Sequence, residues 1–160
     1  MDIFEFAMQM EKDGEDYYRQ LAEQTENKGL KRIFTMLADD EAKHYETIKK
    51  MRTEPSRLAE TQVLSDSKNI FAQYKASGEK FNFDIKQTDL YRKAQEIEKK
   101  SRDFYLAKAK EVEAAYQKEI FLKLADEEEK HYLILENIIE FVSRPETWVE
   151  NAEFYHTEPY

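Results

Sequence analysis

The sequence contains no cysteine, and it has only three glycines and three prolines among its 160 residues. Without thiols, disulfides, thiolate zinc sites, iron–sulfur clusters and cysteine nucleophiles are excluded. Any metal that the chain binds must therefore be held by oxygen and nitrogen atoms. The shortage of glycine and proline leaves little material for turns, so we expect long helices and very little strand.

The sequence also lacks a long apolar run and an excess of positive charge. No window approaches 18 apolar residues, and residues 1–5 lack the basic flank and apolar run of a signal peptide. The formal net charge is -9, which argues against nucleic acid and anionic membranes as partners because both carry negative charge. We therefore expect a cytoplasmic protein that binds neither.

Apolar residues instead recur at steps of three and four along four long segments, the period of helices that bury one face. The pattern predicts one helix over residues 2–25 and a second that ends near residue 52. Asn27 to Gly29 is expected to end the first helix in the left-handed conformation. A third helix is predicted to be capped by Thr88 and Asp89, and a fourth to end before Pro145. This is an all-α four-helix bundle.

The connections complete the expected organisation. Residues 53–87 are predicted to form a long crossover that contains one short helix near residues 66–75. With this crossover included, the predicted bundle domain covers residues 1–143. Residues 144–160 form a tail, in which residues 146–154 are predicted to be a short helix docked by Trp148.

The sequence contains an internal repeat with an offset of 87 residues. Residues 4–51 and 91–138 are identical at 17 of 48 positions, which indicates a duplicated helical hairpin over about 4–52 and 91–139. The repeat also decides one ambiguity. Residues 112–117 contain no glycine, proline or asparagine, so periodicity alone would allow a single helix there, but they align with the break at residues 27–30.

On each predicted helix, the apolar residues spaced by three and four positions form a seam that faces the core. Each repeat carries one lone glutamate and one Glu-x-x-His motif on these seams. Burying an uncompensated carboxylate costs several kcal/mol, and four together would also repel one another. Two divalent cations would neutralise them, and a Glu and a His three residues apart on a helix can bind one ion together. The predicted metal ligands are Glu11, Glu41, His44, Glu98, Glu128 and His131.

One alternative to metal is a buried polar network in which Arg102, the only cation next to these positions on the seams, and protonated groups balance the charge. Tyr18 and Tyr105 lie seven residues after a seam glutamate. They are expected either to pack in the core with the hydroxyl tied to a carboxylate, or to take a supporting or radical role beside the metal.

Other acidic residues near the motifs are expected to face solvent. Asp39 and Asp126 lie off the seam, and in the acidic run 126–129 only Glu128 is expected to point inward. A third Glu-x-x-His, Glu153 to His156, lies outside the repeat and is expected to be surface.

These motifs resemble the rubrerythrin-like branch of the ferritin-like di-iron proteins. Residues 10–18 and 97–105 are similar to the family's first and third helices, and Leu-Ala-Asp-x-Glu-x-Lys-His-Tyr at residues 37–45, with its near-copy at 124–132, to the second and fourth. The resemblance implies a ferritin-like bundle with two iron ions per chain, manganese and zinc being the alternatives. It also implies that the six predicted ligands bind iron and that Glu41 and Glu128 bridge the ions.

The chain departs from rubrerythrin in two ways. Ser101 stands where rubrerythrin has an additional glutamate, so the iron movement of its peroxide reduction would lack that ligand. The cysteine-ligated rubredoxin module is missing, so electrons would come from a separate donor protein.

Three functions share this centre. The first is a di-iron oxidoreductase that reduces hydrogen peroxide or dioxygen, which we expect as a homodimer. The second is a ferroxidase that stores iron in a closed cage of many subunits. The third is a non-catalytic module that a metal ion stabilises.

Overall fold

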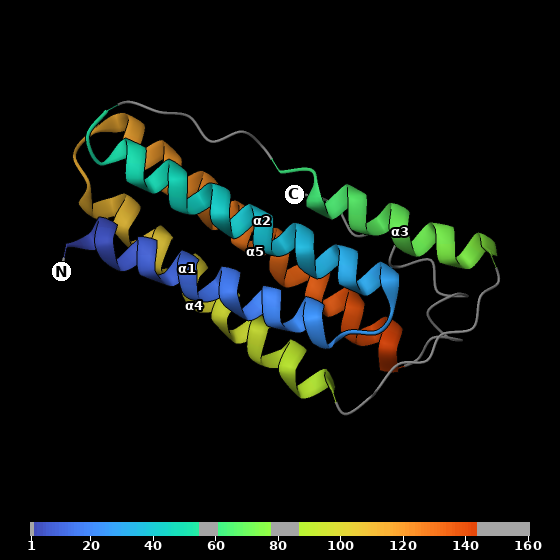
Figure 1. The fold of residues 1–160 in the computed structure, drawn as a ribbon. Helices are drawn as coiled ribbons and strands as arrows, with labels where there is room; N and C mark the ends of the chain where they lie inside the picture. Colours follow the sequence, from blue (N-terminus) through green and yellow to red (C-terminus); the bar gives the residue numbers. More distant parts are fainter. Residues whose placement is uncertain (1, 55–60, 78–86, 144–160) are drawn as a thin grey trace.

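The computed structural model describes residues 2–54, 61–77 and 87–143, and these residues contain five α-helices and no β-strand (Figure 1). The helices are α1 Ile3–Gln24, α2 Lys28–Met51, α3 Val63–Ser77, α4 Thr88–Glu111 and α5 Ala115–Ser143. The predicted all-α fold is confirmed. The predicted tail helix, Trp148, Glu153 and His156 lie outside the described residues.

Side-chain caps begin the first two helices. The Asp2 carboxylate accepts a hydrogen bond from the Glu5 amide at 2.8 Å, and the Asn27 side chain accepts one from the Leu30 amide at 3.0 Å. Each cap satisfies an amide that the helix itself leaves unpaired. The predicted left-handed end at residues 27–29 is wrong, because Thr25 and Asn27 are extended and Gly29 lies inside α2.

The ends around α4 agree with the sequence only in part. The helix begins at Thr88, but Gln87 occupies the cap position and makes no capping hydrogen bond with its side chain. The predicted cap by Thr88 and Asp89 is therefore wrong. The predicted break after α4 is confirmed, since Val112 is extended and α5 begins at Ala115. The repeat located this turn where local sequence could not.

The four long helices form a bundle in which α1 packs against α2 and α4, and α5 packs against α4 and α2 (Figure 1). Helix α3 belongs to the crossover and packs on α2 and α5, outside the four-helix core. It begins earlier than residues 66–75 would predict. The result is the expected ferritin-like arrangement of two helical hairpins joined by a long connection.

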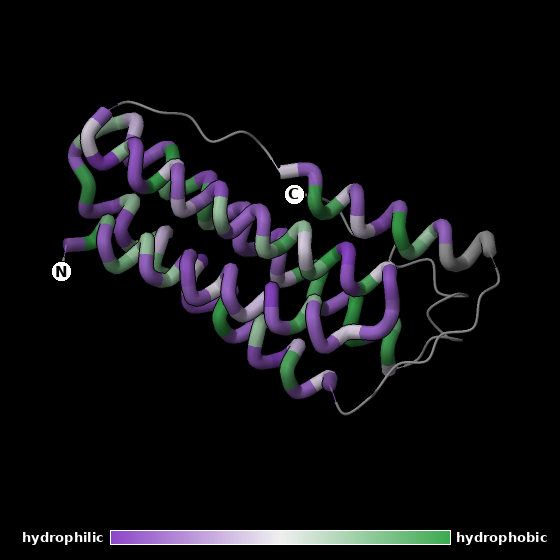
Figure 2. Tube along the Cα trace, in the orientation of Figure 1, coloured by the Kyte–Doolittle hydropathy of each residue, from purple (hydrophilic) through white to green (hydrophobic). Residues whose placement is uncertain are grey.

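Two hydrophobic clusters fill the bundle, one toward each end. Along each helix, hydrophobic residues alternate with hydrophilic ones (Figure 2). The larger cluster includes Leu37, Phe71 and Ile134, and the smaller includes Ile48, Tyr105 and Phe121. On all four bundle helices the predicted ligand positions fall between residues of the two clusters. The centre of the bundle is therefore polar, with apolar packing on either side.

Among the described residues, no helix has an apolar stretch long enough to cross a membrane.

Candidate metal centre

The six residues predicted as ligands come together in the middle of the bundle. Each is buried, with at most 3% of its surface exposed. Donor atoms of Glu11, Glu41, His44 and Glu128 lie within 4.8 Å of one another, and so do those of a second group, Glu41, Glu98, Glu128 and His131. Each group could hold one metal ion. Glu41 and Glu128 belong to both groups, which is the position expected of bridging carboxylates.

The contacts of the centre join one repeat to the other. His44 Nδ1 lies 3.1 Å from Glu128 Oε1, and His131 Nδ1 lies 2.9 Å from Glu41 Oε1. The offset of 87 residues relates His44 to His131 and Glu41 to Glu128, so the two pairs are equivalent contacts of the repeat. The two imidazole rings stack with their centroids 5.8 Å apart and their planes 10° apart. Duplication of the hairpin has thus produced two matching half-sites that share their central carboxylates.

Several buried polar atoms of the centre have no hydrogen-bond partner among the described residues. They include Glu11 Oε2, Glu41 Oε1, Glu98 Oε2, Glu128 Oε1 and His44 Nδ1. His44 Nδ1 approaches Glu11 Oε2 at 3.3 Å, but this pair lacks hydrogen-bond geometry. Buried polar atoms are rarely left unpaired, and oxygen atoms with one imidazole nitrogen suit iron, manganese or zinc. The donor set therefore fits a pair of metal ions.

Repulsion among the buried carboxylates raises the pKa values of the two shared glutamates. Burial raises the pKa of Glu41 well above its ordinary value, and the carboxylates of Glu11 and Glu128 raise it further. Burial and the carboxylates of Glu98 and Glu11 likewise raise the pKa of Glu128. Without a cation, the protonated form of these two shared glutamates is favoured, because ionisation would add another negative charge to the centre.

The histidines show the same excess of negative charge. Burial alone would lower the pKa of His44, but Glu11, Glu127 and Glu128 outweigh burial and hold that pKa well above its ordinary value. The pKa of His131 is raised in the same way, by Glu98, Asp40 and Glu41 against burial. Without metal, the surrounding carboxylates would therefore favour protons on these histidines, and metal binding would displace the protons.

Two carboxylates that sequence reasoning missed hold the outer nitrogens of the histidines. Glu127 Oε1 lies 2.7 Å from His44 Nε2, and Asp40 Oδ2 lies 3.0 Å from His131 Nε2. Thr61 Oγ1 donates to Asp40 at 2.5 Å. A proton on Nε2 leaves Nδ1 free to bind metal, so these carboxylates fix the ring tautomer and orientation.

The prediction that only Glu128 of the acidic run points inward is therefore wrong, because Glu127 is 4% exposed. A usable signal was present, since Asp40 and Glu127 are acidic at equivalent positions of the repeat. Their partners could not be foreseen because each contacts the histidine of the opposite repeat.

Tyr18 and Tyr105 are each tied to a carboxylate of the centre, as one of the two interpretations predicted. Tyr18 Oη donates to Glu98 Oε1 at 2.5 Å, and Tyr105 Oη donates to Glu11 Oε1. Both bonds cross between repeats. Burial and the facing carboxylates raise the pKa of both phenols well above the ordinary value, so each stays protonated as a donor. These bonds orient Glu98 and Glu11, the two carboxylates that each belong to only one of the two donor groups.

The remaining charged residues near the motifs lie outside the centre. Arg102 pairs with Glu129 and Asp103, so it does not neutralise the buried carboxylates. Asp39 pairs with Arg19, and Asp126 pairs with Lys130. Asp39 and Asp126 are exposed, as predicted, and the alternative of a network balanced by Arg102 is not supported.

Replacing Glu127 with glutamine should weaken metal binding without abolishing it. The glutamine would lose the charge that holds the Nε2 proton of His44, and loss of such outer partners lowers metal affinity about 10- to 100-fold. Competition with a coloured chelator would measure the change. Glu119→Gln, at an exposed position of the same helix, is the matched control. Equal affinity in wild type and Glu127→Gln would contradict a positioning role.

A comparison with protein-family models matched the rubrerythrin family over residues 2–139, which includes α1, α2, α4, most of α5 and all six buried donor residues. No curated protein and no solved structure matched the chain. The family match covers most of the sequence and agrees with the paired half-sites in the bundle. The chain belongs to the rubrerythrin family.

Proposed function

We propose that the protein is a di-iron oxidoreductase that reduces hydrogen peroxide or dioxygen with electrons from a separate donor protein. The observation that carries the proposal is the buried pair of Glu/His groups in a member of a family that typically binds iron. Paired redox-active metals at such a centre supply electrons and stabilise the charge that develops on the reduced oxygen atoms.

The proposed ligands follow the two donor groups. Glu11 and His44 would belong to one ion, Glu98 and His131 to the other, and Glu41 and Glu128 to both. Four carboxylates would then balance the charge of two ferrous ions. The imidazoles would bind through Nδ1, because Nε2 of each ring faces an outer carboxylate.

The surrounding residues would keep this centre in place during turnover. Glu127 and Asp40 hold the imidazoles, and the two tyrosine hydroxyls hold Glu98 and Glu11. The hydrophobic clusters at either end exclude water along the bundle axis. Because the sequence contains no cysteine, it offers no iron–sulfur relay, which is why we propose an external electron donor.

Anaerobic loading with ferrous iron, followed by stopped-flow addition of hydrogen peroxide, tests the proposal. We expect rapid growth of a ferric absorption band, with one peroxide consumed for every two ferrous ions because the O–O bond takes up two electrons. Zinc-loaded protein is the control for peroxide absorption. A loaded centre that is not oxidised would contradict the proposal and favour a metal that only stabilises the bundle.

Size-exclusion chromatography separates this function from iron storage, which uses the same kind of centre. We expect a homodimer. A closed shell of a dozen or more subunits that takes up many iron ions per chain would contradict the oxidoreductase proposal.

A further inference from the structure

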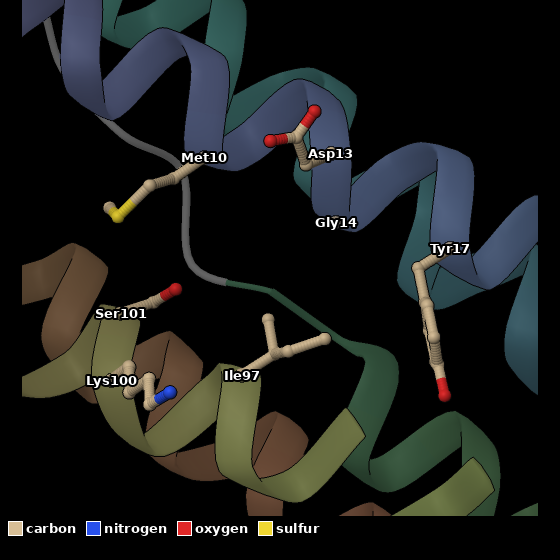
Figure 3. A pocket seen from close by; sticks show the side chains of 7 residues that line it. All are labelled: Met10, Asp13, Gly14, Tyr17, Ile97, Lys100 and Ser101. Carbon is tan, nitrogen blue, oxygen red and sulfur yellow. The ribbon is translucent and has the colours of Figure 1, made fainter. Parts of the chain in front are cut away.

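A pocket of about 370 Å³ lies between α1 and α4 (Figure 3). Six of its seven lining residues form three pairs at equivalent positions of the repeat, and Tyr17 completes the wall. The pairs are Met10 with Ile97, Asp13 with Lys100, and Gly14 with Ser101. The pocket therefore lies where the two repeats face each other across α1 and α4.

One residue of the pocket wall, Gly14, also approaches the proposed metal centre. A Cβ atom added at Gly14 would come within 3.0 Å of Glu41 Oε2, so the glycine backbone packs closely against this shared carboxylate. The equivalent position on α4 carries the small side chain of Ser101, which points between the helices in Figure 3. The histidines of the centre come from α2 and α5 instead. The α1–α4 face is thus the side on which the small residues Gly14 and Ser101 lie, although the carboxylates of the centre are themselves buried.

The pocket is much larger than hydrogen peroxide requires. A water molecule occupies about 30 Å³ of the liquid, and a cavity of about 150 Å³ holds benzene. The space here therefore accommodates an organic group of benzene size or larger. Met10, Ile97 and the ring of Tyr17 supply apolar wall, and Asp13 and Lys100 are exposed residues of opposite charge. Such a lining suits a neutral, mainly apolar ligand better than an anion.

We propose that this pocket binds the organic part of a hydroperoxide and directs its peroxide group past Gly14 and Ser101 to the metal centre. The inference rests on the proposed function and names its substrate class. In the reaction the O–O bond breaks, and the two oxygen atoms take up two electrons and two protons. An alcohol and water are released. The electrons come from the two ferrous ions of the loaded centre, and the protons come from solvent.

Binding can be tested without turnover, with the full chain loaded with redox-silent zinc. The probe is 2-phenyl-2-propanol, the alcohol product of cumene hydroperoxide, and the readout is the NMR shift of the Met10 methyl group, which also lines the pocket. We expect saturable shifts. Ile97→Trp should fill much of the pocket and weaken binding about tenfold or more, because the larger ring would occupy the space that the ligand needs. Leu106→Trp, which adds the same ring at an exposed position of α4, should bind as wild type does.

Single-turnover oxidation of the ferrous-loaded protein provides the second measurement. We expect Ile97→Trp to lower the rate ratio of cumene hydroperoxide to hydrogen peroxide at least about tenfold, whereas Leu106→Trp should leave the ratio unchanged. Absence of alcohol binding, or an unchanged ratio in Ile97→Trp, would overturn the inference while hydrogen peroxide still oxidises the centre. Failure of both peroxides to oxidise it would overturn the proposed function and this inference together.

Discussion

Glu41→Gln is expected to release both metal ions and to remove the stability that they provide. Glu41 belongs to both donor groups, and an amide cannot supply the negative charge that two cations share. Metal present at about a thousand times its dissociation constant stabilises the native state by about 4 kcal/mol, so loss of binding should remove that amount. Metal analysis of the purified variant and thermal unfolding with and without metal would measure both effects.

The metal-free forms should behave differently. Glu41 is buried beside like-charged groups that raise its pKa, so a neutral amide of the same size should leave the metal-free protein as stable or make it more stable. Glu46→Gln, at an exposed position of the same helix, should match wild type in both forms. Equal destabilisation of Glu41→Gln with and without metal would mean that Glu41 serves the packing of the bundle instead.

The pH dependence of stability is expected to differ between the metal-free and metal-bound protein. The pKa values of Glu41, Glu128, His44 and His131 are raised in the folded state, so the fold binds more protons than the unfolded chain. Metal-free protein should therefore lose stability as the pH rises above the ordinary glutamate pKa of 4.5, and lose more above the ordinary histidine pKa of 6.5. The lowered pKa values of Glu11 and Asp40 act with the opposite sign, but only below about pH 5.

Metal should reverse this trend, because ions compete with protons for the same atoms. The increase in melting temperature on loading should therefore grow between about pH 5 and pH 8. Denaturant unfolding of both forms across this range is the measurement. A metal-free protein that gains stability as the pH rises would show that the buried carboxylates are already neutralised within the chain.

Much of this structure could be predicted from the helical spacing of apolar residues and from the internal repeat. The spacing of apolar residues by three and four positions predicted that Glu11 and Glu98 lie on the helix faces that also bury Ala7 and Tyr105. A polar residue on a helix face that packs into the core is buried together with its apolar neighbours. The repeat then supplied the turn before Ala115 and the matching of the half-sites. Helix period and duplication are local or self-consistent signals, so no tertiary contact was needed to read them.

The missed features depend on how the hairpins pack. Asp40 and Glu127 reach the histidine of the opposite repeat, which requires the axial register of α2 against α5. The helix ends at Asn27 and Gln87 were misassigned for a local reason, since several neighbouring residues can occupy a cap and small differences in backbone angle decide among them. The close approach of Gly14 to Glu41 could not be predicted either, because it depends on the spacing of α1 and α2.

Anomalous X-ray diffraction from crystals of the iron-loaded protein, recorded at the iron edge, tests the metal centre most directly. We expect two peaks per chain inside the bundle, one within each donor group and both beside the carboxylates of Glu41 and Glu128. One peak should also lie beside His44 and the other beside His131. Iron found only on the surface, or carboxylates of Glu41 and Glu128 that remain bonded within the chain in loaded crystals, would contradict the di-iron centre.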